Sequence, residues 1–196
     1  MSLLRRSLTS TLLIAALYIA LDAIVVFLFN PIQFHFLPGI SPYSSLIYLP
    51  FALRVFGTSL LGKEAIPGLF IGMLASSHYF WSVNDVEMLL ALSFIGGFST
   101  WLVFRAIAPL GVDAFYLADR TQVPPLNTYL VAGLFVATLD AFLMVAVLEA
   151  FGKVHQASLT YASFVLGALS GLVVGWYLAQ ASLPLVNRLF RSDRAE

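Results

Sequence analysis

Three charged residues lie inside apolar stretches long enough to cross a membrane, and their types make them the strongest candidates for chemistry. They are Asp22, Arg54 and Asp140. A charge at the bilayer centre costs roughly 2.5 to 3.5 kcal/mol on insertion scales, so such residues nearly always face a partner inside a helix bundle. At a rise of about 1.5 Å per residue, all three fall within about two turns of the expected midplane. We therefore expect Arg54 to pair with Asp140 or with Asp22.

One cation and two carboxylates leave a surplus of negative charge if all three meet. A bound proton or a bound cation would remove that surplus, which suggests a proton-linked or cation-binding function. The alternative is that Arg54 pairs with one aspartate, while the other faces water or, protonated, bonds a backbone carbonyl. For Asp22, a structural hydrogen bond to a neighbouring helix and a role in handling a ligand or proton both stay open.

The composition indicates that these charges must be positioned by a membrane-embedded helix bundle. Hydrophobic residues make up 60% of the chain and charged residues 10%, with a mean hydropathy of +0.93. Soluble domains are nearer half apolar and a quarter charged. The 196 residues suffice for six crossings in one all-α membrane domain. The net charge of zero does not suggest nucleic acid as a partner, and the absence of cysteine excludes disulfides and thiolate metal sites.

The apolar runs predict six transmembrane helices. We expect them at residues 9–29, 45–62, 66–81, 88–107, 127–151 and 159–183. The first run is longer than the roughly 7 to 15 apolar residues of a signal peptide, so we expect an uncleaved helix. Three prolines, Pro31, Pro38 and Pro42, then argue against a regular helix. The apolar residues among them predict an amphipathic or re-entrant loop.

The distribution of basic residues predicts the orientation of these helices. With six crossings, one side of the membrane collects Arg5, Arg6, Lys63, Arg105, Arg120, Arg188, Arg191 and Arg194. The other side collects Lys153, and Arg54 lies within the membrane. Lys and Arg near short loops concentrate on the cytoplasmic side. We therefore expect a multi-pass protein of the cell (inner) membrane with both termini in the cytoplasm.

His35 lies in the predicted external loop and is a further candidate for binding a ligand or a proton. No second histidine and no carboxylate stands near it at the spacing of metal ligands. An interfacial side chain is therefore the simpler interpretation, and we expect no metal site.

Gly167, Gly171 and Gly175 recur every four residues in the last predicted helix. Such a face of small residues lets another backbone approach closely, which is how membrane helices gain packing energy. It predicts either tight packing within the monomer or the contact of a homodimer.

Residues 47–76, IYLPFALRVFGTSLLGKEAIPGLFIGMLAS, resemble the membrane sensor domain called MASE1. The matching positions are Pro50, Gly62, Lys63, Pro67, Gly68 and Gly72, and residues 164–184 are similar to the glycine-rich last helix of that family. Family members commonly have about eight helices and feed a cytoplasmic signalling domain, whereas this chain ends after RSDRAE. The resemblance implies a stand-alone sensor-like or regulatory module that acts through a membrane or cytoplasmic partner protein.

Two other functions stay open. The size and the six expected helices are also similar to the substrate-capture subunits of energy-coupling-factor vitamin transporters, and an architectural subunit of a membrane complex is the third possibility. We expect no enzyme and no cofactor, because the sequence has no glycine-rich phosphate loop, no zinc-protease histidine pair and no serine elbow. Asp22 and Asp140 also lack the flanking glycine motifs of intramembrane aspartyl hydrolases.

Overall fold

The computed structural model describes residues 3–37, 41–115, 125–154 and 156–192, and side chains within 7–37, 41–115, 125–154 and 156–181. These residues form helices and connections, with no strand among them. The helices are α1 (Leu3–Ile24), α2 (Asn30–Phe36), α3 (Leu49–Leu61), α4 (Ile66–Tyr79), α5 (Val86–Ile107), α6 (Leu126–Ala150) and α7 (Ala157–Ser192). A π-helical turn, Val25–Phe29, joins α1 to α2, and 3-10 turns occupy Gly62–Ala65 and Ala108–Leu110.

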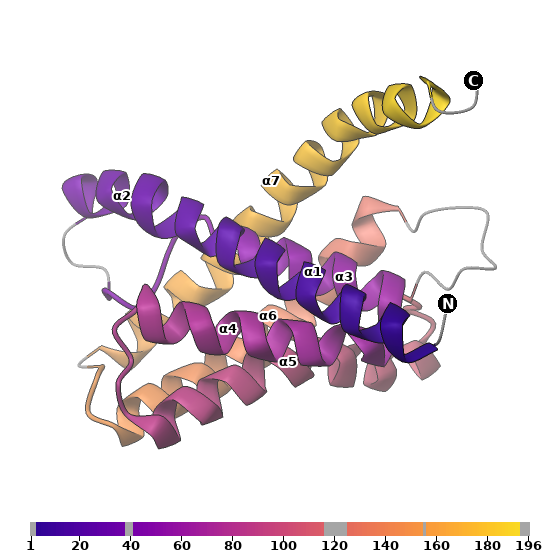
Figure 1. Ribbon diagram of the computed structural model, residues 1–196. Coiled ribbons are helices and arrows are strands. Elements are labelled where there is room, and N and C mark those ends of the chain that lie inside the picture. The colour runs from indigo at the N-terminus through magenta and orange to yellow at the C-terminus, as the bar shows by residue number, and fades with distance from the viewer. Residues whose placement is uncertain (1–2, 38–40, 116–124, 155, 193–196) are drawn as a thin grey trace.

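The helices pack in a ring. α1 contacts α4, α4 contacts α5, α5 contacts α6, α6 contacts α7, and α7 contacts α3, which returns to α1. The connections from α2 to α3, from α4 to α5 and from α6 to α7 lie at one end of the bundle, on the left in Figure 1. The α3–α4 turn and the start of α1 lie at the other end. Neighbours along the chain therefore run in alternating directions.

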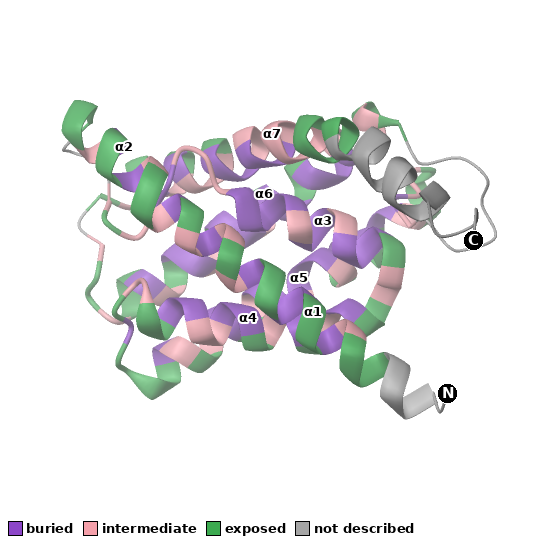
Figure 2. Cartoon of the chain, turned by 45° about the horizontal axis from the view of Figure 1, so that its top comes forward, coloured by how far each residue is buried: buried purple, intermediate pink, exposed green. Residues whose placement is uncertain are grey.

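Apolar side chains cover the outside of the bundle as well as its core. Figure 2 shows buried residues where helices face one another and exposed residues on the outer faces. Leu12, Phe94, Phe142 and Leu166 are all more than half exposed, on four different helices. A surface of this kind is suited to lipid rather than to water.

Four helices are long and apolar enough to cross a membrane. They are Ser7–Phe36, Val86–Leu110, Leu126–Ala150 and Ala157–Ala181. α3 and α4 have 13 and 14 residues, so each is about 20 Å long, against a hydrocarbon core of about 30 Å. The protein is thus an all-helical membrane protein, and the expected number of six crossings stays a prediction.

The first helix continues beyond Pro31, contrary to our expectation. The N–H of Asn30 donates to the carbonyl of Val25, five residues back, which is the bond of a π-helical turn. Pro31 therefore lies in the first turn of α2. Proline is tolerated there, because backbone N–H groups in the first turn have no partner within the helix. The expected loop is thus helical from Asn30 to Phe36, with Asn30 and Gln33 buried and Phe36 73% exposed.

The expected helix at 45–62 begins four residues later, at Leu49. The backbone of residues 44–48 is irregular and packs between α2 and α7. Gln33 of α2 donates to the carbonyl of Ser44 at 3.1 Å and accepts from the N–H of Leu46 at 2.6 Å. The carbonyl of Gly167 in α7 accepts from the N–H of Tyr48 at 2.9 Å. Because these partners satisfy its backbone groups, the segment needs no helix. Helix α1 begins at Leu3, six residues before the expected start, and α7 extends to Ser192, nine residues beyond the expected end. The other ends of helices α3 to α7 agree with our expectation within two residues.

The glycine face of α7 lies against this segment and α3. A side chain at Gly167 would meet the carbonyl of Ser45, one at Gly171 the carbonyl of Tyr48, and one at Gly175 the side chain of Ala52. Each contact would be too close for a Cβ atom. The three glycines therefore face neighbours from the same chain, as packing within the monomer requires.

Candidate functional site

Arg54 forms a buried ion pair with Asp140 at the centre of the bundle. Arg54 lies in the middle of α3, Asp140 lies on α6, and Nη2 of Arg54 is 2.5 Å from Oδ2 of Asp140. Their side chains are 2% and 9% exposed. Nη2 also donates to Oγ of Ser99 at 2.8 Å and to Oγ1 of Thr100 at 3.4 Å, both on α5. One guanidinium thus links α3, α5 and α6.

The ion pair keeps unused capacity for hydrogen bonding. Nε of Arg54 and Oδ1 of Asp140 are both buried, and neither makes a hydrogen bond of ordinary geometry. The hydroxyl of Ser99 also faces the Asp140 carboxyl. A buried polar atom without a partner costs roughly 1 to 3 kcal/mol. These two atoms would therefore gain from a ligand or a water molecule that offers an acceptor and a donor.

Asp22 is buried on α1 and has a different partner. Its Oδ2 accepts a hydrogen bond at 2.9 Å from Nε1 of Trp81. The residue is 1% exposed. The hydroxyl of Ser76 faces the same carboxyl, but Oδ1 and that hydroxyl are not joined by a hydrogen bond of ordinary geometry. The structure thus brings Arg54 together with Asp140 and leaves Asp22 outside that pair.

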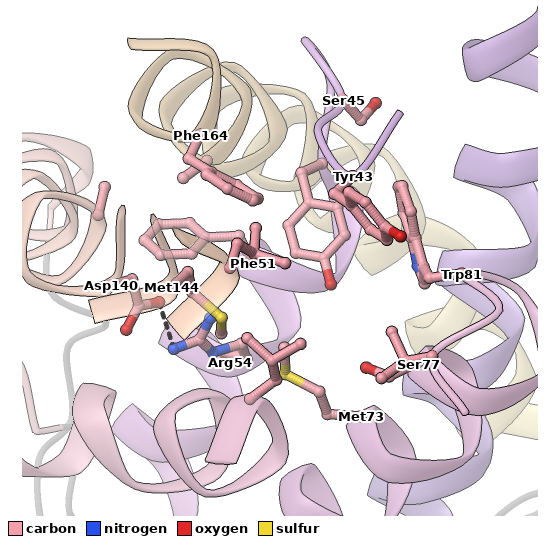
Figure 3. A pocket seen from close by; sticks show the side chains of 16 residues that line it. Tyr43, Ser45, Phe51, Arg54, Met73, Ser77, Trp81, Asp140, Met144 and Phe164 are labelled. Carbon is pink, nitrogen blue, oxygen red and sulfur yellow. Dashed lines mark ion pairs between the residues drawn. The ribbon is translucent and has the colours of Figure 1, made fainter. Parts of the chain in front are cut away.

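A cavity of about 80 Å³ lies beside the ion pair, on the side toward the α4–α5 connection, and Arg54 and Asp140 form part of its wall. Its walls include five aromatic rings, from Tyr43, Tyr48, Phe51, Trp81 and Phe164. Figure 3 shows the ion pair at one side of this space, with Tyr43 and Trp81 across from it. The lining residues come from the 41–48 segment, the turn after α4, and helices α3 to α7. The cavity therefore lies toward the end of the bundle where the α4–α5 connection lies.

Two contacts fix the orientation of wall residues. The hydroxyl of Tyr48 is 2.7 Å from the hydroxyl of Tyr18, which is fully buried on α1. The guanidinium of Arg54 lies 5.6 Å from the centre of the Phe51 ring, within the range of a cation–π contact. These contacts hold Tyr48 and Phe51 in place, so this part of the aromatic wall is preformed.

Three residues of the site, Trp81, Ser99 and Thr100, were not predicted from the sequence, although each has a partial signal there. A tryptophan at the end of an apolar helix, as Trp81 is, is typical of the aromatic belt at a membrane interface. A carboxylate in an apolar helix needs a donor, however, and an indole N–H can supply one. Ser99 and Thr100 lie inside the apolar run of residues 88–107. Small hydroxyl residues in such helices commonly bond across to a neighbour, which is the signal that could have found them.

His35 does not line the cavity. It is exposed at the end of α2, and its ring lies edge-on to Phe36 at 5.1 Å. Within the part of the chain that the structure describes, no three His, Cys, Asp or Glu side chains are close enough to share a metal ion. The arrangement around Arg54 and Asp140 is thus suited to binding by apolar contact and hydrogen bonds.

Comparison of the chain with protein-family models, with curated proteins and with solved structures found no match. The geometry of the cavity is therefore the basis for a functional proposal.

Proposed function

We propose that this protein is a membrane domain that captures a small, uncharged and mainly apolar molecule above the Arg54–Asp140 pair and presents it to a partner protein. The observation that carries the proposal is a cavity with aromatic walls and one buried ion pair. Ligand pockets are typically lined by apolar and aromatic side chains, with a few polar groups that fix the orientation of the ligand.

Charge compensation inside the cavity favours an uncharged ligand. Arg54 and Asp140 neutralise each other, so a charged molecule would lose its hydration without gaining a free counter-ion. An uncharged molecule avoids that cost, and one polar group on it can hydrogen-bond with Arg54 or Asp140, which both line the cavity.

The size of the cavity favours a ligand of about one ring at most. Its volume of about 80 Å³ is roughly half that of the apolar cavity of about 150 Å³ that is known to accept benzene. A ring therefore fits only if the walls shift. Met73 and Met144 line the cavity, and methionine side chains adapt their shape more readily than branched ones.

The proposal includes six crossings, both termini in the cytoplasm, and residence in the cell inner membrane. The positive-inside asymmetry supports this orientation. It would place the connections that follow α2, α4 and α6 outside, and the cavity lies toward that end of the bundle. A ligand would then arrive from the external side.

Sensing and uptake both begin with this binding step. As a sensor-like module, the protein would change the activity of a membrane or cytoplasmic partner when the cavity fills. As a substrate-capture subunit, it would hand the molecule to a transporter, and cells would accumulate the compound. An architectural subunit would need no ligand, and a possible homodimer would need a surface other than the glycine face, which α3 and residues 45–48 cover.

The test is equilibrium dialysis of the protein in lipid nanodiscs against benzyl alcohol, benzamide, benzylamine and benzoate. We expect saturable binding of the two uncharged compounds and weaker binding of the charged ones. Ala137→Met fills the cavity from α6 and should abolish binding. Ala146→Met is the matched control, because Ala146 is exposed on the same helix. Absence of saturable binding, or equal binding by both variants, would contradict the proposal and favour the architectural function.

A further inference from the structure

A second hollow, of about 390 Å³, lies next to the cavity and nearer the surface. We call it the vestibule. It is lined by the π-helical turn and α2 on one side and by residues 80–82 on the other, and Pro31, Pro42 and Ser82 in its walls are exposed. Asn30 also lines it, 5% exposed, with an Oδ1 that has no hydrogen-bond partner. π-helical turns are frequent at functional sites, so the vestibule has features of a functional site.

Tyr43 and Trp81 line both the vestibule and the inner cavity. Their side chains therefore form the partition between the two hollows. The inner cavity alone is small, whereas the two hollows joined would fall within the roughly 300 to 1,000 Å³ typical of ligand pockets. Movement of this partition would thus provide both an access route and the space that a ring-sized ligand needs.

Asp22 holds one side of the partition. Its Oδ2 accepts the indole N–H of Trp81 at 2.9 Å, and the carboxyl is buried on α1, 59 residues away along the chain. Trp81 itself lies outside any helix, in the turn after Tyr79, and the next residue, Ser82, has a positive φ of 54°. The Trp81 ring packs against the core cluster that includes Leu69 and Met88, and its hydrogen bond to a buried acceptor sets the orientation of the ring.

We propose that Trp81 and Tyr43 form a movable gate between the vestibule and the inner cavity, and that Asp22 is the positioning residue that keeps the gate closed. The purpose of the gate rests on the proposed function, whereas the experiment that tests the gate needs no ligand. Asp22 then has a role in access to the cavity, while Asp140 has a role inside it.

The test measures the reactivity of a thiol inside the cavity. The chain has no cysteine, and Ser77 lines the inner cavity, is 5% exposed and does not line the vestibule. Ser77→Cys therefore places a single thiol behind the gate. Its rate of reaction with methyl methanethiosulfonate, followed by mass spectrometry in nanodiscs, reports how often the gate opens.

We expect Asp22→Leu and Trp81→Phe each to raise this rate about ten- to a hundredfold, because each removes a hydrogen bond to a charged group. Asp22→Asn keeps an acceptor without the charge, so its rate should lie between those of the parent and of Asp22→Leu. It also serves as the informative variant if Asp22→Leu does not fold.

The matched control is Ser82→Cys, which places the thiol on the exposed wall of the vestibule. Its rate should be fast and should not respond to Asp22→Leu or Trp81→Phe. An unchanged rate for Ser77→Cys in these variants would overturn the gate, because the reagent would then reach the cavity by another route. An equal rise at both positions would also overturn it, since general loosening of the fold would explain both.

The thiol reaction needs no ligand, so the two proposals can fail separately. If Asp22→Leu and Trp81→Phe change the reactivity of Ser77→Cys but none of the four ring compounds binds, the gate is supported and the proposed function is contradicted. If the compounds bind while the reactivity of Ser77→Cys is independent of Asp22 and Trp81, the proposed function is supported and the gate is contradicted.

Discussion

Asp140 on α6 supplies the carboxylate for Arg54 on α3, with Nη2 and Oδ2 2.5 Å apart in the middle of the bundle. The two residues are 86 positions apart in the chain and both are almost fully buried. Breaking a buried pair from one side strands the other charge, which is why single and double substitutions must differ.

Arg54→Leu should therefore lower the free energy of unfolding by roughly 3 to 5 kcal/mol, more than Leu53→Ala on the same helix. The double variant Arg54→Leu with Asp140→Leu should recover much of that loss, because no buried charge remains. Arg54→Leu with Asp22→Leu should not recover it, since Asp22 bonds Trp81 instead. Unfolding of the purified variants by denaturing detergent gives these values. Equal recovery in both double variants, or in neither, would show that Arg54 does not depend on Asp140.

Gly171→Ala should destabilise the protein, because a Cβ at this position meets the carbonyl of Tyr48. Gly57→Ala is the matched control on α3, where a Cβ meets no atom within 4 Å. There alanine should be neutral or stabilise by up to about 1 kcal/mol through its higher helix propensity. Thermal unfolding measures both. A stable Gly171→Ala variant that has lost a dimer on native gels would instead assign the glycine face to a homodimer.

Labelling of introduced cysteines by an impermeant maleimide should place Lys63 on the cytoplasmic side and Asn84 and Lys153 on the external side. The assignment of Lys63 and Asn84 decides between four and six crossings. If α3 and α4 cross the membrane, the two positions lie on opposite sides. Protection of both, or labelling of both from outside, would restrict the crossings to the four long helices.

Some of the site was predictable from the sequence because it follows from electrostatics alone. Arg54 inside an apolar run had to find a carboxylate, since an unpaired guanidinium there is too costly. Which aspartate it finds depends on the rotation of α1 and α6 about their axes, and helices that are apolar on nearly all faces do not reveal that rotation. Sequence reasoning therefore left Asp22 and Asp140 as equal candidates.

One error in the fold has a tertiary cause and the other has a local cause. Residues 45–48 look like the start of an apolar helix, but Gln33 and Gly167, both distant in the chain, bond their backbone and stabilise an irregular path. Pro31 looks like the end of a helix, but the π-helical turn before it changes the bonding so that a new helix begins there. Helix propensity describes neither tertiary hydrogen bonds nor π-helical turns, so these features need the structure.

Trp81 provides the most direct measurement of the central claim, that the cavity above Arg54 and Asp140 binds a small uncharged molecule. The chain has three tryptophans, so Trp101→Phe with Trp176→Phe leaves Trp81 as the sole emitter, in the cavity wall. Titration of this protein in nanodiscs with benzyl alcohol should change its emission saturably. Ala137→Met should abolish the change and Ala146→Met should retain it. A change that rises linearly and equally in all three proteins would mean that the compound dissolves in the lipid, and it would contradict a binding site in this cavity.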